Sequence, residues 1–412
     1  MEQNTIDLYI TGIANGGEGI GRLPDGRIVF VPFTIPGESV RIRVLESKKG
    51  FVRGELVEIL ASVPGRIVPR CRHFGVCGGC HLQHMDYNTQ INMKTDIVKD
   101  VLSRIGGLKE VNIQPIVPSP VEWEYRNQVQ YHLHPSGKLG YQRHSSHETI
   151  PIEECFLPVK PLVEIRNNLD LDPQAGIKRV TFREGLDDDY LIVLEGNSID
   201  MPEMEIELPF SVVHQSESGI ITLAGCDFVQ MQIKDKVFKV SAGSFFQVNT
   251  RMAELMVNHV LSLIPPGKLD CILDLFCGVG LFSAFVAEKA KRLIGVESGQ
   301  SACSDYAENM DAFDHVELYE GLCEQVLPGL DIHPDVMIVD PPRAGTGKVT
   351  LESLIRMKPK RIIYISCDQA TLARDASQLV KAGYKIMQVT PFDLFPQTHH
   401  IESITQFSNM SE

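Results

Sequence analysis

The segment LDLFCGVG, residues 273–280, decides the fold of the C-terminal half of this 412-residue chain. An apolar, strand-like run ends in it, and a helical pattern follows. The same alternation continues downstream, where further apolar runs precede helical segments: RLIGVE at 292–297, DVMIVD at 335–340 and RIIYIS at 361–366. Strands that alternate with helices are typical of βαβ units. We therefore expect residues 236–412 to form an α/β domain around a parallel sheet.

The LDLFCGVG loop also has the residue types of a nucleotide-cofactor site. Asp274 ends the expected strand, and Glu297 ends the next one, where an acidic side chain can accept hydrogen bonds from both ribose hydroxyls. Gly278 and Gly280 let the backbone approach a ligand closely. Ser283 stands where the dinucleotide fingerprint needs a third glycine. The loop thus favours a nucleoside without a pyrophosphate, such as S-adenosylmethionine; the alternative is a purely structural glycine turn.

Two further strand ends carry chemically active side chains. Asp340 and Arg343 belong to DVMIVDPPRAG, where two prolines fix an extended turn, and Cys367 directly follows RIIYIS. Open α/β sheets bind ligands at the carboxyl ends of their strands. A helix is expected to begin near Gln369, so its backbone dipoles should lower the pKa of the Cys367 thiol. Cys367 is a candidate nucleophile; the alternative is a small, buried apolar residue.

The C-terminal segment PFDLFPQTHHIES, residues 391–403, supplies a candidate general base. Glu402 lies just before the last expected strand, with His399 and His400 close by. A carboxylate or an imidazole in this place could reach the same sheet edge as Cys367. The alternative is a solvated glutamate before an edge strand.

Residues 1–60 read as short strands separated by glycine-rich turns. The strand-like runs are IDLYITGI, GRIVFVPF, ESVRIRVLES and FVRGELVEIL, and ANGGEGIGRLPDG lies between the first two. We expect a small five-stranded, OB-like barrel, a fold that binds nucleic acid in many proteins and is an inert module in others. A helix is expected at about 86–106, and residues 120–235 look mainly β.

Four cysteines have the spacing of a metal or cluster site, and they are Cys71, Cys77, Cys80 and Cys155. Three close thiols and a remote fourth are typical of iron–sulfur sites, because structural zinc usually shows two C-x2-C pairs. His73 and His81 could compete as ligands. Spacing alone leaves the choice between a cluster and zinc open.

Composition narrows the classes of protein and of partner. Hydrophobic residues make up 43% and charged residues 22%, as in folded globular chains. No apolar run approaches the ~20 residues of a membrane helix, and the N-terminus lacks the pattern of a signal peptide, so we expect a cytoplasmic protein with no membrane partner. The net charge of −14 opposes nucleic acid as a partner, but −10 of it falls within residues 161–235. The total charge therefore does not exclude nucleic acid as a partner.

Together these motifs resemble the RNA 5-methyluridine (uracil-C5) methyltransferases, specifically the iron–sulfur class with an N-terminal TRAM domain that acts on 23S ribosomal RNA. The resemblance covers essentially the whole chain and rests on motifs in family order: ITGIANGGEGIGRLPDGRIVFVPFTIPGE, the cysteine set, EWEYRNQVQYH, SAGSFFQVN, LDLFCGVG, DPPRAG, ISCDQATLARD and HHIES. It implies a TRAM barrel at 1–60, a β-rich, cluster-bearing domain at 61–235 and a Rossmann-like methyltransferase domain at 236–412.

The resemblance also implies roles for individual residues. Cys367 matches the nucleophile that adds to C6 of uracil, and Glu402 matches the base that removes the C5 proton. The four cysteines match the ligands of a [4Fe-4S] cluster. The implied S-adenosylmethionine contacts are Gln247, Phe276, Glu297 and Asp340. Three positions differ from the family's usual residues, namely Leu281, Gly321 and Gln397.

The implied partner is RNA, most often ribosomal RNA, bound by a monomer. A transfer RNA, or a non-catalytic role in RNA binding, is the alternative. Phe245 and Phe246 are candidates to stack on the uridine, which has to leave its stack to react. We expect RNA binding to depend on shape and base contacts more than on bulk charge. The available cations are Arg66, Arg70, Arg72, Arg126, Lys138 and Arg143.

Overall fold

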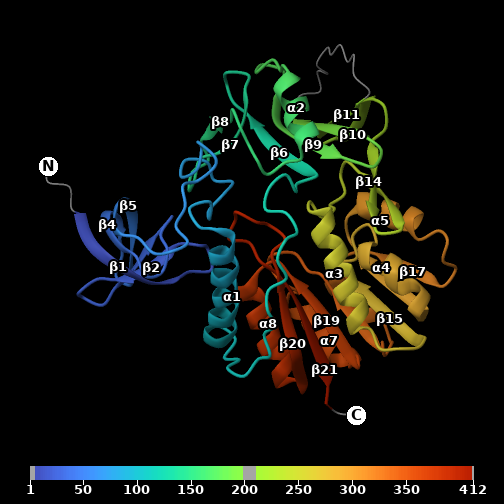
Figure 1. Cartoon of the computed structure of the whole chain (residues 1–412). Coiled ribbons are helices and arrows are strands. Elements are labelled where there is room, and N and C mark those ends of the chain that lie inside the picture. Colours follow the sequence, from blue (N-terminus) through green and yellow to red (C-terminus); the bar gives the residue numbers. More distant parts are fainter. Residues whose placement is uncertain (1–4, 198–209, 411–412) are drawn as a thin grey trace.

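The computed structural model describes residues 5–197 and 210–410, which fall into three regions: a barrel, a central β-rich region and a larger α/β region (Figure 1). The barrel is closed, in the strand order β1-β2-β3-β5-β4. Its strands are β1 Thr5–Ile13, β2 Gly19–Arg22, β3 Ile28–Val31, β4 Ser39–Ser47 and β5 Phe51–Ala61. The five-stranded barrel is confirmed. β2, however, lies within the glycine-rich segment expected as a turn. Residue 21 of this strand is a glycine because the Leu8 side chain fills the space where a Cβ would stand.

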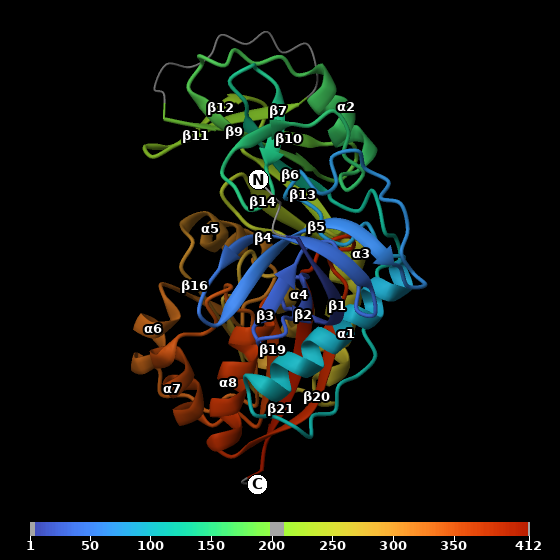
Figure 2. The same cartoon turned by 90° about the vertical axis from the view of Figure 1, so that its left-hand side faces the viewer.

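Helix α1 (Tyr87–Arg104) connects the barrel side of the molecule to the α/β region. Asp86 caps it by accepting a hydrogen bond from the Thr89 N–H. Its buried face shares a hydrophobic core with Leu372 and Leu379 of α8 (Gln369–Lys381), and the two helices lie side by side in Figures 1 and 2. The helix expected at 86–106 therefore forms, and it packs on the third region.

The central region is a seven-stranded sheet in the order β12-β11-β10-β9-β6-β7-β8. Its strands are β6 Gln128–Leu133, β7 Leu139–Gln142, β8 Thr149–Pro151, β9 Ile177–Glu184, β10 Tyr190–Gly196, β11 Ser211–Ser216 and β12 Gly219–Ala224. Helix α2 (Lys160–Asn168) packs Leu162 against Val180 and Phe182 of the sheet. The hairpin of β13 (Phe228–Ile233) and β14 (Lys236–Ser241) then leads into the α/β region.

The α/β region is a second seven-stranded sheet, in the order β17-β16-β15-β18-β19-β21-β20. Its strands are β15 Leu269–Leu275, β16 Ala290–Glu297, β17 Val316–Glu320, β18 Val336–Val339, β19 Arg361–Ser366, β20 Tyr384–Phe392 and β21 Glu402–Asn409. Its further helices are α3 Thr250–Leu263, α4 Leu281–Val286, η1 Ala287–Lys289, α5 Gln300–Asn309, α6 Cys323–Val326, η2 Leu327–Gly329 and α7 Lys348–Met357.

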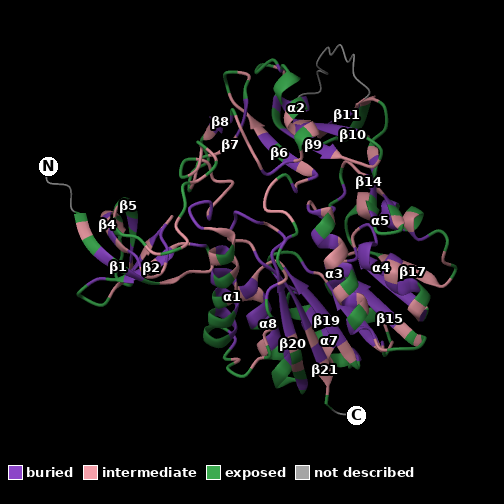
Figure 3. Cartoon of the chain, in the orientation of Figure 1, coloured by how far each residue is buried: buried purple, intermediate pink, exposed green. Residues whose placement is uncertain are grey.

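Alternation along the strands places helices on both faces of this sheet. Ile272 packs in one core with Met256 of α3 and Phe282 of α4, whereas its neighbour Leu273 packs in another with Leu354 of α7. Both faces of the central strands are therefore buried, and Figure 3 shows them mainly in purple. The expected parallel sheet needs one correction, because β21 runs antiparallel to both of its neighbours. No helix among the described residues has the length and apolar character needed to cross a membrane.

Candidate active site

The predicted site residues meet at one edge of the α/β sheet. Phe276, Asp340 and Cys367 follow the adjacent strands β15, β18 and β19, and Glu297 ends β16. Glu402 starts β21, and because that strand is antiparallel, its start lies at the edge where the other strands end. Ser366 of β19 pairs with Ser403 of β21. Cys367, which follows Ser366, therefore lies next to Glu402, which precedes Ser403. The reversed strand thus brings the candidate base beside the candidate nucleophile.

Glu297 is oriented by backbone donors at this edge. One carboxylate oxygen accepts hydrogen bonds from the N–H groups of Ser298 and Gly299, both at 2.7 Å, and the other accepts from Gly278 N–H at 3.0 Å. Gly280, with φ of 93°, is the N-cap residue of α4. The loop therefore fixes an acidic acceptor, as the ribose of a nucleoside requires.

Asp274 stabilises the cofactor loop through a buried hydrogen bond to α4. It is buried and accepts a 2.6 Å hydrogen bond from the Ser283 hydroxyl, which in turn accepts one from Tyr306. Burial raises the pKa of Asp274 to about 7. The serine that replaces the third glycine of the dinucleotide pattern thus has a structural partner, which the sequence did not indicate.

Gln247 lies in a buried segment that precedes α3. Its carbonyl accepts a hydrogen bond from Asn127 of the central region, and Asn249 caps the helix. Phe246 is buried in the core, whereas Phe245 is 70% exposed. Of the two candidate stacking residues, only Phe245 is accessible to a base.

Cys367 opens onto a cavity of about 150 Å³ at the sheet edge. Arg343, His399 and His400 also line this catalytic cavity, together with Asn15 of the barrel. Next to Asn15 in the same turn, a Cβ at Gly17 would lie 2.9 Å from Cβ of His399, so only glycine fits there without a shift. The barrel therefore closes one side of the cavity, a contact that the glycine-rich segment did not predict.

The expectation of a lowered thiol pKa at Cys367 is wrong. Burial, together with the charges of Glu402 and Asp340, raises its pKa to about 12, and Arg343 opposes this shift. The N-terminus of α8 offers little compensation, because Asp368 already caps it through the Thr371 N–H. A protonated thiol is therefore the resting form at neutral pH.

The pKa of Glu402 is raised as well. Burial raises its pKa well above the usual range, Asp340 adds to this shift, and Arg343 opposes it. Burial likewise raises the pKa of Asp340 to about 7. Arg343 is the exposed cation that faces this group of acids. The site can therefore hold a proton on a carboxyl group and release it when a cationic ligand enters.

The loop between β20 and β21 is held from outside the α/β region. Gln397, with φ of 70°, exchanges hydrogen bonds with Gln90 of α1 through its backbone N–H and its side chain. Its carbonyl accepts from the N–H groups of His81 and Leu82. Lys94 of α1 donates to the buried Asp393 carboxylate at 2.5 Å. The loop that leads to Glu402 is thus fixed by α1 and by the cysteine-rich segment.

The four predicted ligand cysteines line a second cavity, here called the cysteine cavity: they are Cys71, Cys77, Cys80 and Cys155. The remote fourth cysteine is therefore brought to the other three. Gly79 N–H donates to the Cys77 sulfur at 3.3 Å, and burial raises the pKa of Cys77 to about 11 and that of Cys80 to about 12. Bound iron or zinc would have to displace these protons.

Of the two competing histidines, His73 lines the cysteine cavity and His81 does not. His73 accepts a hydrogen bond from Glu153 N–H through Nε2, and the His81 ring lies 4.4 Å from that of His399. Across residues 5–197 and 210–410, no three His, Cys, Asp or Glu side chains form a group that could hold a single metal ion.

Known proteins resemble this chain along its full length. Residues 197–409 match the family described as tRNA (uracil-5-)-methyltransferase, and residues 1–57 match the TRAM domain. An uncharacterized RNA methyltransferase of Streptomyces avermitilis is 34% identical, covering 97% of this chain and 96% of that protein. Another, of Clostridium tetani, is 33% identical and covers 98% and 96%.

A solved structure agrees with this assignment. The tRNA (uracil-54, C5)-methyltransferase of Pyrococcus abyssi, in complex with S-adenosyl-L-homocysteine, is 25% identical and superposes with a TM-score of 0.75, covering 98% of this chain and 100% of that one. The chain therefore belongs to the RNA uracil-C5 methyltransferase family, with an N-terminal TRAM domain, and is an S-adenosylmethionine-dependent enzyme.

Proposed function

We propose that the enzyme methylates C5 of a uridine in ribosomal RNA, 23S RNA in particular, through a covalent adduct between Cys367 and C6 of the base. The observation that carries this proposal is that Cys367 and Arg343 line the catalytic cavity while the buried Glu402 lies directly beside Cys367. C5 of uracil is a weak nucleophile, and covalent addition at C6 is a way to activate it.

The residues act in a fixed order. Cys367 gives its proton to solvent and its sulfur bonds to C6, and the electron pair of the C5–C6 double bond moves toward C5 and the O4 oxygen. Arg343 stabilises this negative charge. S-adenosylmethionine supplies the sulfonium methyl group that C5 takes. Glu402, as the carboxylate, then removes the C5 proton, and the returning electron pair expels the thiolate.

We propose that Glu297 binds the ribose hydroxyls of the cofactor and that Phe276, Asp340 and Gln247 complete its site. Glu297 is suited to this role because three backbone donors fix its carboxylate. Phe276 has a φ of 59°, which turns the chain directly after β15 at the cofactor loop. Asp340 lies between the cofactor loop and Cys367 in strand order.

We further propose that the four thiols of the cysteine cavity hold a [4Fe-4S] cluster. The support is that all four line one cavity, together with apolar and aromatic side chains such as Phe74, Tyr141 and Phe156. The cluster needs no redox role in this reaction. It stabilises a segment without long helices or strands, whose His81 and Leu82 N–H groups hold the loop that precedes Glu402.

The domain division that goes with this function is residues 1–60, 61–235 and 236–412, in a cytoplasmic monomer. The second boundary falls in the turn between β13 and β14. RNA reaches the catalytic cavity from the barrel side, since Asn15 and Gly16 of the β1–β2 turn line it. A transfer RNA uridine is the alternative substrate.

The substrate is tested by methyl transfer in vitro. The purified chain is incubated with radiolabelled S-adenosylmethionine and, separately, with ribosomal RNA and transfer RNA from cells that lack the gene. We expect label in 5-methyluridine of the large ribosomal RNA. Label found only in transfer RNA would show that transfer RNA is the substrate instead. Absence of label in both RNAs would contradict the proposed function.

A further inference from the structure

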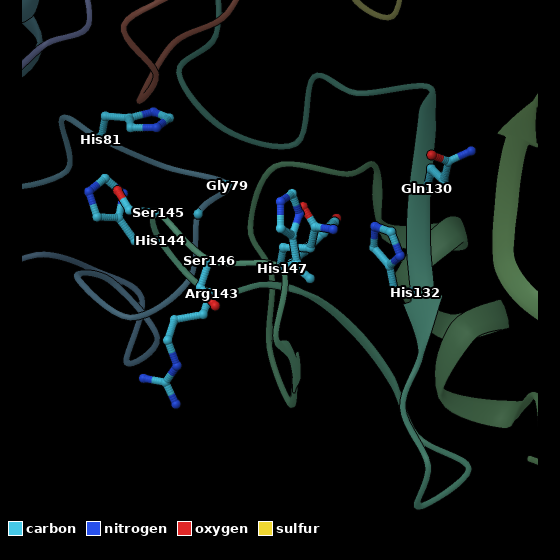
Figure 4. Close-up of a pocket in the computed structure, with 12 residues that line it drawn as sticks. Gly79, His81, Gln130, His132, Arg143, His144, Ser145, Ser146 and His147 are labelled. Carbon is cyan, nitrogen blue, oxygen red and sulfur yellow. The ribbon is translucent and has the colours of Figure 1, made fainter.

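The structure contains a third cavity, of about 590 Å³, beside the catalytic cavity (Figure 4). Three segments line it: the loop between two of the cysteines, strand β6, and β7 with the turn that follows it. We call it the histidine cavity because four imidazoles line it: His81, His132, His144 and His147. The resemblance to known enzymes gave it no role.

The histidine cavity is polar but offers little net charge. Arg143, the one arginine or lysine among its described lining residues, has its Nε 2.6 Å from Glu148. Burial, and secondarily Arg179, lower the pKa of His132, so its imidazole is neutral at physiological pH. Gln130 is oriented by hydrogen bonds from its amide to Glu195 and Thr181. Aromatic rings and amides suit a nucleobase, which stacks on aromatic faces and forms hydrogen bonds at its edges, better than a phosphate.

Two paired imidazoles separate the histidine cavity from the catalytic cavity. His81 lines the first and His399 lines the second, and their ring centroids are 4.4 Å apart. His144 lies 6.1 Å from His81 on the other side. One ring pair is thus the partition between the two cavities, so one RNA strand can place adjacent bases on its two sides.

We propose that the histidine cavity holds the base of an unpaired nucleotide next to the target uridine. This inference rests on the proposed function, because the target uridine is defined as the one that reaches Cys367. Through this cavity the enzyme would recognise the RNA sequence next to the target uridine without needing a large cationic surface. This arrangement fits the engagement of two other candidate cations, since Arg66 pairs with the buried Glu38 and Arg72 pairs with Glu153 and Glu154.

The test uses the full chain, S-adenosylmethionine and a single-stranded RNA library with one central 5-fluorouridine and random flanks. Denaturation-resistant adducts are recovered and their RNA is sequenced. We expect enrichment of particular bases at one position adjacent to the 5-fluorouridine. His132→Ala with His147→Ala should abolish that enrichment and weaken library binding roughly tenfold, as loss of base stacking does. The matched control is His134→Ala, whose ring contacts Ser136 locally and does not line the cavity.

The outcomes separate this inference from the proposed function. Unchanged preference in the double variant, or an equal loss for all sequences, would overturn the inference; an equal loss indicates a phosphate contact. In a second arm, 4-thiouridine at the adjacent position is photo-crosslinked, and the linked peptide should lie within residues 78–81 or 130–147, which contain the residues that line the cavity. Crosslinks there without any adduct would contradict the proposed function alone, whereas adducts with crosslinks elsewhere would overturn the inference alone.

Discussion

The catalytic cavity and the cysteine cavity both contain cysteines whose thiols burial holds in the protonated state, yet their surroundings differ. Cys367 stands alone at the end of a buried strand, facing the carboxyls of Glu402 and Asp340 and the Arg343 guanidinium. The four thiols of the cysteine cavity face each other on loops. Burial and pKa therefore do not distinguish a nucleophile from a ligand; the neighbouring groups do. A lone thiol with acid–base partners is suited to covalent chemistry, whereas converging thiols are suited to a cluster.

The largest effect is expected at the catalytic cavity, from Glu402→Gln. An amide cannot accept the C5 proton, so turnover should fall about 10²–10⁴-fold, the usual contribution of a general base. The covalent RNA adduct should accumulate, because addition and methylation precede the missing step. Single-turnover kinetics with gel detection of the adduct would measure both. Normal product release by this variant would exclude Glu402 as the base.

The corresponding change at the cysteine cavity is Cys155→Ser. Anaerobically purified protein should lose the visible absorption of an iron–sulfur cluster and lose cluster affinity more than 100-fold, since even residues that only support a metal ligand contribute 10–100-fold. The exposed Cys226→Ser is the matched control and should keep the spectrum. Wild-type protein that contains zinc and shows no visible absorption would contradict the cluster and leave the four-thiol site in place.

The two cavities should also respond differently to pH. Cys367, with a pKa of about 12, and Glu402, with a pKa well above its usual range, act only when deprotonated. Their active fraction therefore grows as pH rises, and the single-turnover rate should increase between pH 6 and pH 8, by about tenfold per pH unit where the Cys367 thiol controls it. Cluster absorption should stay constant over the same range. A rate that falls with rising pH would contradict the assignment of both groups.

The smallest effect is expected at the link between the two cavities, from Gln397→Ala. The change removes one buried hydrogen bond to Gln90 and keeps the backbone bonds from His81 and Leu82. Unfolding free energy should fall by about 1 kcal/mol, the net value of one such bond. The turnover rate should fall a few-fold with an unchanged KM for S-adenosylmethionine. A much larger loss would show that Gln397 contacts the substrate itself.

Sequence predicted the parts of the site that depend on local pattern. Asp340 and Cys367 directly follow apolar runs, so their place at the sheet edge followed from strand ends alone. The antiparallel direction of β21 could not be read in this way, because it depends on pairing with β19 and β20, and neither could the approach of Asn15. The raised pKa of Cys367 was missed for the same reason: it comes first from burial in the folded chain and then from two acids, Asp340 after β18 and Glu402 of β21.

The central claim is that Cys367, and none of the other nine cysteines, forms the bond to RNA. The direct test incubates the wild-type chain and Cys367→Ala with 5-fluorouridine-substituted ribosomal RNA and S-adenosylmethionine, followed by denaturing electrophoresis and peptide mapping. Fluorine at C5 cannot be removed as a proton, so the wild-type adduct persists. We predict an adduct on the peptide that contains Cys367 and none in the variant, which should still bind S-adenosylmethionine. An adduct in Cys367→Ala, or one mapped to another cysteine, would contradict the account.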